Sequence, residues 1–326
     1  MADGASARKF PSMNRAYNSV FRPGQLSLGL VLPLDAHQVG AIPDISRHME
    51  RARLADELGY AALWLRDVPF NVPSFGDAGQ MFDPFVYLGL LSGITRDIAL
   101  GVASIILPLR HPAHVAKAAA SADQLSEGRL LLGVASGDRP EEFPALGMSF
   151  QDRGARFRDS LAYIRAMADD RPEFEGAHGA LKGSIDMLPK PVAGRVPVLI
   201  TGGAQQSPEW IAKHGDGWMT YPRDVVAQAN VVSDYRSRSA AVGAPEKPVM
   251  QSLYIDLVED GSEPRPIHLG FRSDIPFLKT YLHALQDHGI NHVALNLRFN
   301  HTDIENTLKR LADTLLPDFP TPGRSQ

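Results

Sequence analysis

Short apolar runs recur along this chain, and amphipathic segments separate most of them. Eight of the runs have the length and the continuous apolar character of buried strands. Most intervening segments place apolar residues three and four positions apart, which is the period of a helix with one buried face. The alternation predicts a mostly parallel sheet covered by helices. The predicted strands begin near residues 26, 60, 98, 129, 197, 216, 248 and 291.

The segment from about Asp44 to Gly59 shows the repeated unit clearly. Its apolar residues form one helical face: Ile45, Met49, Ala52, Ala55 and Leu58. Gly59 suits the left-handed residue that ends many helices. The next strand, residues 60–65, follows at once, and the same order of helix, glycine and strand returns around Gly128 and Gly289.

Eight strands alternating with helices predict a (β/α)8 barrel of the α/β class, with extended loops at the C-terminal ends of the strands. The alternative is an open doubly wound sheet, but no G-x-G-x-x-G turn follows the first strand as it would in a Rossmann sheet. We expect residues 26–316 to form one domain. Residues 1–25 are expected to be an N-terminal extension and residues 317–326 a C-terminal tail.

The composition narrows the function. The chain has 326 residues, a net charge of −4 and no cysteine, which excludes disulfides, thiolate nucleophiles and cysteine-bound metal centres. Lysine and arginine do not gather into a basic stripe, so nucleic acid is not expected as a partner. The N-terminus lacks the apolar stretch of a signal peptide, and no apolar run reaches the roughly 18 residues of a membrane helix. We therefore expect a cytoplasmic protein that does not enter the membrane.

Small residues stand where the third and fourth predicted strands end, and barrels place their chemistry at such strand ends. A flat ring could lie against Ala103 and Ser104, which could equally be two small core residues. Ser136 and the Gly137 amide could donate to a phosphate, with Arg139 adding charge. The alternative for the second pair is an ordinary polar turn.

The turn after the fifth predicted strand, residues 198–208, reads V-L-I-T-G-G-A-Q-Q-S-P. Gly202 and Gly203 allow the backbone to turn tightly beside a ligand, and Ser207 is suited to cap the next helix. Backbone N–H groups and the positive end of a helix dipole make such a turn a candidate phosphate site. The alternative is a plain glycine turn, but two loops of this kind on successive strands favour the phosphate site.

Asp67 and His111 are further polar candidates near strand ends. Asp67 follows the second strand, where it could act as an acid or base or pair with Arg66. His111 and His114 are three residues apart at the start of a helix. No carboxylate partner for them is evident and Pro112 marks a helical first turn, so no metal site is expected.

Four segments, in this order, resemble the bacterial luciferase-like monooxygenase superfamily. They are G-V-A-S-I-I-L-P-L-R-H-P, D-Q-L-S-E-G-R-L-L-L-G-V-A-S-G, R-G-A-R-F-R-D-S-L and V-L-I-T-G-G-A-Q-Q-S-P-E-W-I-A-K-H-G-D-G-W. The resemblance covers roughly residues 26–315. It implies a barrel that binds a reduced flavin, commonly FMN and in some branches the deazaflavin F420.

The resemblance also assigns roles to residues. It implies a cis peptide bond between Ala103 and Ser104 beneath the flavin ring. It places the flavin phosphate near Ser136, Gly202, Gly203, Gln206 and Ser207, beside the Gly137 amide proposed above as a donor. This agrees with the interpretation of those loops from their residues alone.

One position departs from the family pattern. The family often has Glu-His after the second strand, and this chain has Asp67-Val68. Asp67 is therefore a candidate catalytic acid or base. His111 and His37, on neighbouring loops, are candidates to replace the missing histidine.

The resemblance favours a flavin-dependent monooxygenase acting with oxygen on a small organic substrate, and a homodimer. Its FMN would be reduced by a flavin reductase or by NAD(P)H. Residues 67–81 would form a lid with Gly76 and Gly79 as hinges. The alternatives are an F420-dependent hydride-transfer enzyme, with Arg139, Arg153 and Arg156 near the mouth of the barrel, and a non-catalytic flavin-binding protein.

Overall fold

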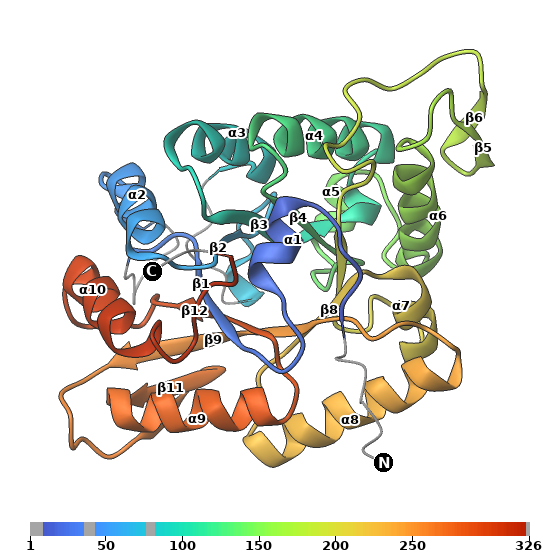
Figure 1. The fold of residues 1–326 in the computed structure, drawn as a ribbon. Helices are drawn as coiled ribbons and strands as arrows, with labels where there is room; N and C mark the ends of the chain where they lie inside the picture. The colour runs from blue at the N-terminus through green and yellow to red at the C-terminus, as the bar shows by residue number, and fades with distance from the viewer. Residues whose placement is uncertain (1–8, 36–42, 76–81, 324–326) are drawn as a thin grey trace.

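The barrel predicted from the sequence is present. The computed structural model describes residues 9–35, 43–75 and 82–323. Eight parallel strands pair in sequence order and close into a barrel when the last pairs with the first (Figure 1). They are β1 (Ser27–Val31), β2 (Ala62–Leu65), β3 (Ala99–Ile106), β4 (Leu130–Ala135), β7 (Val198–Thr201), β8 (Gly217–Thr220), β9 (Val249–Leu257) and β12 (His292–Asn296). Each begins within two residues of its predicted start.

Helices lie around the outside of the barrel and cover its strands. The longer ones are α2 (His48–Leu58), α3 (Pro84–Ile94), α4 (Pro112–Leu125), α6 (Arg153–Ala166), α7 (Pro208–His214), α8 (Val225–Ala241), α9 (Ile275–Asp287) and α10 (Ile304–Leu315). The prediction that α2 starts at Asp44 was wrong by four residues, because Asp44 Oδ1 accepts from the Ser46 amide in a turn. Gly59 ends α2 in the left-handed conformation, as predicted (φ 94°).

A short helix, α1 (Arg15–Val20), closes the end of the barrel where the strands begin. Its apolar side chains join the cluster that fills the lumen. The Tyr17 hydroxyl donates to the Asp216 carbonyl (2.9 Å), and the Asn14 amide donates to the Leu130 carbonyl (2.8 Å). The described part of the expected N-terminal extension therefore packs against the barrel. At the other end of the chain Phe319 is fully buried.

A histidine and a tryptophan occupy the lumen. Trp64 Nε1 donates to His292 Nε2 (2.8 Å), while His292 Nδ1 lies 2.8 Å from the Ser27 hydroxyl. A Cβ atom on Gly29 would come within 2.6 Å of His292, and one on Gly101 would overlap Trp64. Glycine at these two positions therefore gives the rings their space.

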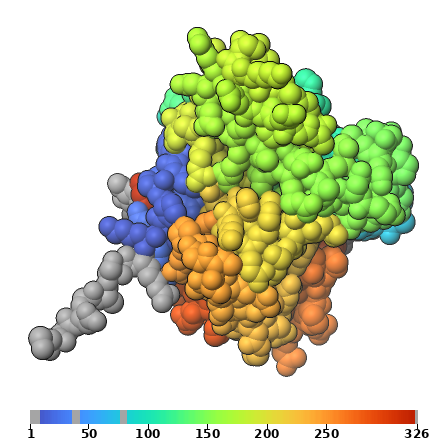
Figure 2. Space-filling model, turned by 90° about the vertical axis from the view of Figure 1, so that its right-hand side faces the viewer, coloured from blue at the N-terminus to red at the C-terminus, as the bar shows by residue number. Residues whose placement is uncertain are grey.

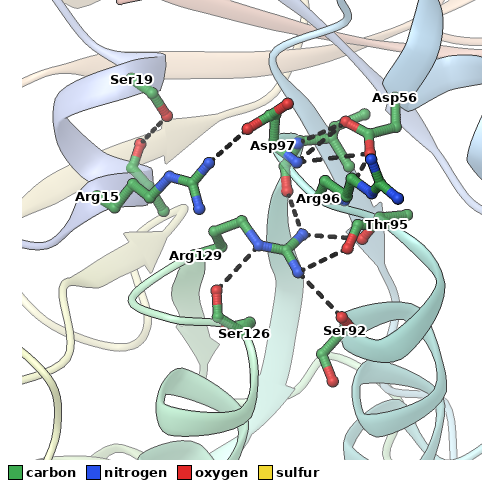
Figure 3. A network of polar contacts seen from close by, with 11 residues as sticks. Arg15, Ser19, Asp56, Ser92, Thr95, Arg96, Asp97, Ser126 and Arg129 are labelled. Atoms are coloured by element: carbon green, nitrogen blue, oxygen red, sulfur yellow. Dashed lines mark hydrogen bonds and ion pairs between the residues drawn. The ribbon is translucent and has the colours of Figure 1, made fainter.

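Arg129, at the start of β4, ties several elements together beside α1 (Figure 3). Its buried guanidinium donates to the carbonyls of Ser126, Ile98 and Ser92, at 2.9, 3.0 and 3.1 Å, and to Thr95. Nearby, the Asp56 carboxylate accepts from three successive backbone amides that lead into β3. These contacts fix the ends of α2, α3 and α4 at the start of the barrel.

Two excursions interrupt the repeat. Residues 169–195 carry a hairpin of β5 (Glu173–Gly176) and β6 (Gly179–Lys182), which projects from the body in Figure 2. After β9, the strands β10 (Arg265–Ile267) and β11 (Gly270–Ser273) form a second hairpin. β11 pairs in parallel with the last residues of β9, so it extends the barrel wall beyond the end of β8. Within the described part of the chain, no helix is both long enough and apolar enough to span a membrane.

Candidate functional site

Three neighbouring strands, β3, β4 and β7, bring the candidate cofactor residues to one edge of the barrel. The Ala103–Ser104 peptide bond near the end of β3 is cis, as the family resemblance implies. The register between β3 and β4 shifts at this point. The Ser104 hydroxyl shares a hydrogen bond with the Thr201 hydroxyl at the end of β7, and Thr201 also contacts Met219 Sδ at 3.1 Å. Sequence reasoning missed Thr201, although it is the last residue of the V-L-I-T strand.

The loop after β4 is tightly packed. Ser136 is buried, and Gly137 adopts a left-handed conformation (φ 85°) in which a Cβ would lie 2.9 Å from Ile106. The Arg139 side chain is also buried and lies 4.5 Å over the ring of Phe75, with Asp138 at 3.5 Å. Glycine at 137 is therefore required by both the backbone and the space.

The loop after β7 presents backbone amides in a tight turn. Gly202, Ala204 and Gln205 all have positive φ values, of 56°, 44° and 58°. The Gly202 amide donates to Met219 and the Gln206 amide donates to Gly203. The amides from Gly203 to Gln205 have no hydrogen-bond acceptor among the described residues. Successive amides in such a turn form an anion-binding concavity.

The side chains of Gln206 and Ser207 have structural partners. Gln206 Nε2 donates to the Gly154 carbonyl (2.9 Å) and its Oε1 accepts from Arg158 (3.0 Å). Ser207 caps α7 by accepting from the Trp210 amide (3.2 Å). Because α7 has only seven residues, the candidate donors to an anion are the loop amides and not the N-terminus of the helix.

The start of α6, which carries Arg153 and Arg156, lies beside this loop. A Cβ on Gly154 would come within 2.8 Å of Gln205, so α6 and the loop approach closely. Arg153 donates to Phe150 (2.8 Å), and Arg156 lies 3.4 Å from the Pro108 carbonyl. The Nε atoms of both arginines are buried without a hydrogen-bond partner among the described residues. Arg158, further along α6, is the arginine whose described contact reaches the turn, at Gln206.

Asp67 is held in a two-point ion pair. Both of its oxygens accept from Arg110, at 2.7 and 3.0 Å, and Oδ2 also accepts from the Ile106 amide (3.1 Å). Arg110 reaches Asp83 as well, at 2.8 Å. The partner proposed from the sequence, Arg66, was therefore wrong: β2 and β3 are neighbours, and Asp67 joins the loop after β3. A catalytic role for Asp67 stays a prediction.

His111 lies on the outer rim. It caps α4 by accepting from the Ala113 amide (3.2 Å), and its ring packs against His114, Tyr163 and His178, with centroids 6.0, 6.1 and 5.7 Å away. None of its described contacts is with the cofactor candidates above, so its catalytic role also stays a prediction. The candidates His37, Gly76 and Gly79 lie outside the described residues.

Tyr221, after β8, is a rim residue that the sequence did not single out. Its ring lies against Gly202, where a Cβ would be 3.4 Å from Tyr221 Cε2. Burial and the charge of Asp138 raise the pKa of Tyr221, while Arg139 and Arg66 oppose the change. These charges therefore face Tyr221 across the β2, β4 and β8 loops.

Comparison with known proteins agrees with this geometry. The family model described as luciferase-like monooxygenase matches residues 26–265. This chain belongs to that family. The matched segment includes β3 with its cis peptide and the glycine turn after β7.

Single proteins similar to this luciferase-like protein share a third of its residues or fewer over the aligned segments. An uncharacterized protein of Mycobacterium tuberculosis is 33% identical over 190 residues, covering 53% of this chain and 67% of that protein. The fold is similar to that of the monooxygenase RslO1 from Streptomyces bottropensis, with TM-score 0.75, 21% identity and coverage of 89% of this chain and 99% of that chain. An F420-dependent secondary alcohol dehydrogenase, in complex with an F420–acetone adduct, has TM-score 0.72 and 16% identity, with 89% and 98% covered.

Proposed function

We propose that this luciferase-like protein is a flavin-dependent monooxygenase that uses reduced FMN and oxygen on a small organic substrate. The observation that carries the proposal is the turn after β7. Its amides from Gly203 to Gln205 lack acceptors among the described residues, and Arg158 of α6 reaches the same turn at Gln206. A phosphate dianion at this turn would give these amides an acceptor, with the positive charge of Arg158 beside it.

The residues present fit the remainder of the cofactor as well. Ala103 and Ser104 offer a backbone surface with small side chains at the end of β3, two strands from the turn. The hydroxyls of Ser104 and Thr201 are placed there as hydrogen-bond groups. Asp67 and Arg110 hold the loop that follows β3, which keeps this surface fixed.

The bound flavin would supply the electron chemistry toward oxygen. The protein's residues bind and orient the cofactor and shield it from water. Ile106, Leu109 and Phe143 form a buried apolar cluster beside Ser136, which keeps water from that side of the site. The reduced cofactor is proposed to come from a flavin reductase or from NAD(P)H.

F420-dependent hydride transfer is the second candidate. The deazaflavin carries a long anionic tail. Helix α6 carries Arg153, Arg156 and Arg158 and packs beside the β7 loop, where Arg158 bonds to Gln206. The similarity to an F420-dependent alcohol dehydrogenase supports the same alternative.

We also propose that the protein is a homodimer. The outer face of α3 exposes Val86 (73%) and Leu90 (40%), and Met49 of α2 is 38% exposed. Gly89 and Gly93, also on α3, have open space where a Cβ would be, so a second helix can approach α3 closely. A second copy of the chain would cover this apolar face.

The direct test is an absorbance and fluorescence titration of the purified protein with FMN, FAD and F420. We expect FMN to bind most tightly. Tighter binding of F420 would support the second candidate, and no binding by any of them would overturn both. Binding of FMN without any reaction of the reduced complex with oxygen, or of the oxidised complex with NAD(P)H, would identify a non-catalytic flavin-binding protein.

A further inference from the structure

A carboxylate and a histidine form a pair at the C-terminal ends of β9 and β12. His301 Nδ1 lies 2.7 Å from Asp256 Oδ2, and the His301 amide donates to Asp256 Oδ1 (3.1 Å). The Asp256 side chain is 2% exposed, whereas that of His301 is 50% exposed. One buried carboxylate therefore holds both the ring and the backbone of a histidine that reaches solvent.

The pair stands on the inner side of the barrel wall. In the register of β9 and β12, Met250 pairs with His292 and Ser252 with Ala294. Met250 and Ala294 belong to the lumen cluster, and His292 bonds to Trp64 of the same cluster. Side chains alternate along a strand, so Tyr254 and Asp256 share that face. The intervening Leu253, Ile255 and Leu257 belong to the outer core instead. Asp256 thus faces inward, above the mouth of the barrel.

The loop that carries His301 is firmly held. Asn300 is buried, accepts from the Leu257 amide (3.1 Å) and donates to Thr302 (2.8 Å) and Thr307 (3.1 Å). The Phe299 ring packs on Tyr254, with centroids 5.3 Å apart. His301 is therefore held by Asp256 and follows two residues, Phe299 and Asn300, that are themselves fixed, and an acid–base group requires such positioning.

The surrounding charges are few and can be named. Arg272 of β11 lies 3.5 Å from Asp256 on the same face. On either side stand Arg298, over the ring of Phe299 (5.1 Å), and His268, against Tyr254 (5.7 Å). Asp256 is the one carboxylate in this set, so its charge is shared between His301 and Arg272.

The contact with Asp256 sets the tautomer of His301. A carboxylate accepts the proton on Nδ1, which leaves the lone pair of the neutral ring on Nε2. Nε2 has no hydrogen-bond partner among the described residues. It can accept or deliver a proton and exchange it with water, whereas Asp67 is engaged by Arg110 and His111 lies on the outer rim.

We propose that His301 is the proton-transfer group of the site and that Asp256 is its positioning residue. This inference rests on the proposed function. It provides an imidazole in place of the histidine that the family often has at the position of Val68. The substrate would carry a hydroxyl or carbonyl oxygen at the reacting centre. The proton moves between Nε2 and an oxygen atom at the reacting centre, that of the substrate or that of the dioxygen being reduced. Asp256 holds the ring through Nδ1, and water restores the original protonation.

The first experiment needs no substrate. Diethyl pyrocarbonate acylates the unprotonated nitrogen of accessible imidazoles, and peptide mass spectrometry gives the rate at each histidine. FMN at about ten times its Kd should slow the modification of His301 by up to about tenfold, because about a tenth of the sites stay empty. His283 is the matched control, since it is 44% exposed, pairs with Asp318 and lies on the outer helix α9; its rate should not change. If FMN binds and His301 is not protected, the inference is overturned while the proposed function stands.

The second experiment needs no cofactor. Nitrogen-15 NMR of the neutral imidazole should show His301 protonated on Nδ1 in the native protein. The isosteric variant Asp256→Asn should give a mixture of tautomers with the fold retained. A native His301 protonated mainly on Nε2 would contradict the role given to Asp256.

The third experiment measures oxygen consumption by the complex with reduced FMN. Without an organic substrate, two electrons pass to oxygen, and hydrogen peroxide takes one proton from the reduced flavin and one from an acid. His301→Gln should slow this reaction by roughly 100-fold with the Kd for FMN unchanged, and His283→Gln should not. An unchanged rate would refute the proton-transfer role, whereas an inert native complex would count against the proposed function itself.

Discussion

At the scale of single residues, burial and partners determine what each titratable group does. Asp67 and His292 are both buried. The charge of Asp67 is balanced by Arg110, whereas His292 is uncharged because it has no proton on Nε2. Burial lowers the pKa of His292 from 6.5 to about 3. Its neutral ring accepts from Trp64 and so helps to fill the lumen. A histidine in this state is a structural residue of the barrel.

The pH dependence of stability should report this histidine. Between pH 6.5 and 3 the unfolded chain binds a proton that folded His292 does not. Its contribution to stability is therefore complete above pH 6.5 and falls as the pH is lowered, by about 1.4 kcal/mol per pH unit. In His292→Gln, whose amide oxygen can accept from Trp64, urea unfolding between pH 7 and pH 5 should show a shallower loss. Equal slopes for the two proteins would refute the assignment.

At the scale of elements, strand positions followed from the sequence but side-chain partners did not. The apolar runs are continuous because both faces of a parallel strand are buried, so all eight starts could be predicted. The phosphate-loop candidates could then be located, because barrels place their ligand-binding loops at the C-terminal ends of these strands. The pairing of Asp67 with Arg110 depends on which strands are neighbours. The hairpins after α6 and β9 have short, largely exposed strands, which leave little apolar pattern to recognise.

Breaking the network around Arg129 should lower the stability of the fold without changing the affinity for FMN. Arg129→Met removes five hydrogen bonds and leaves buried carbonyl groups without a donor. We expect the free energy of unfolding to fall by about 3 kcal/mol or more. Because the network lies at the opposite end of the barrel from the site, the Kd for FMN should be unchanged.

The matched control is Arg15→Met in the same region. Arg15 pairs with Asp97 at the surface, with side-chain exposures of 42% and 51%. Its removal should cost less than about 1 kcal/mol. Equal losses for the two variants would show that the buried network does not carry the stability assigned to it.

At the scale of the whole molecule, α1 closes one end of the barrel, and the candidate site lies at the other end, where the strands finish. α1 fills the end where the strands begin, so the described part of the expected extension is a component of the barrel's packing. The sequence could not show this, because a six-residue helix has too few residues to display a periodic apolar face. The exposed apolar face of α3 is the feature that points beyond a single chain.

Sedimentation velocity should detect the proposed homodimer. Val86→Glu puts a charge on the apolar face of α3 and should shift the protein toward the monomer. Val226→Glu is the matched control, because Val226 is 70% exposed on α8 and has no part in that face. A native protein that sediments as a monomer, or a dimer insensitive to Val86→Glu, would exclude this interface.

The central claim is that the turn after β7 holds the phosphate of a flavin, and the affinity of Gly203→Asp for FMN tests it most directly. Gly203 has no positive φ, and a Cβ there would meet its nearest neighbour, the Gln206 carbonyl, only at 4.0 Å. Gly203→Ala should therefore fold and bind FMN as the native protein does. Gly203→Asp should fold equally well but bind FMN about 100-fold more weakly, because its carboxylate would face the phosphate. An unchanged Kd in Gly203→Asp would contradict the placement of the phosphate at this turn.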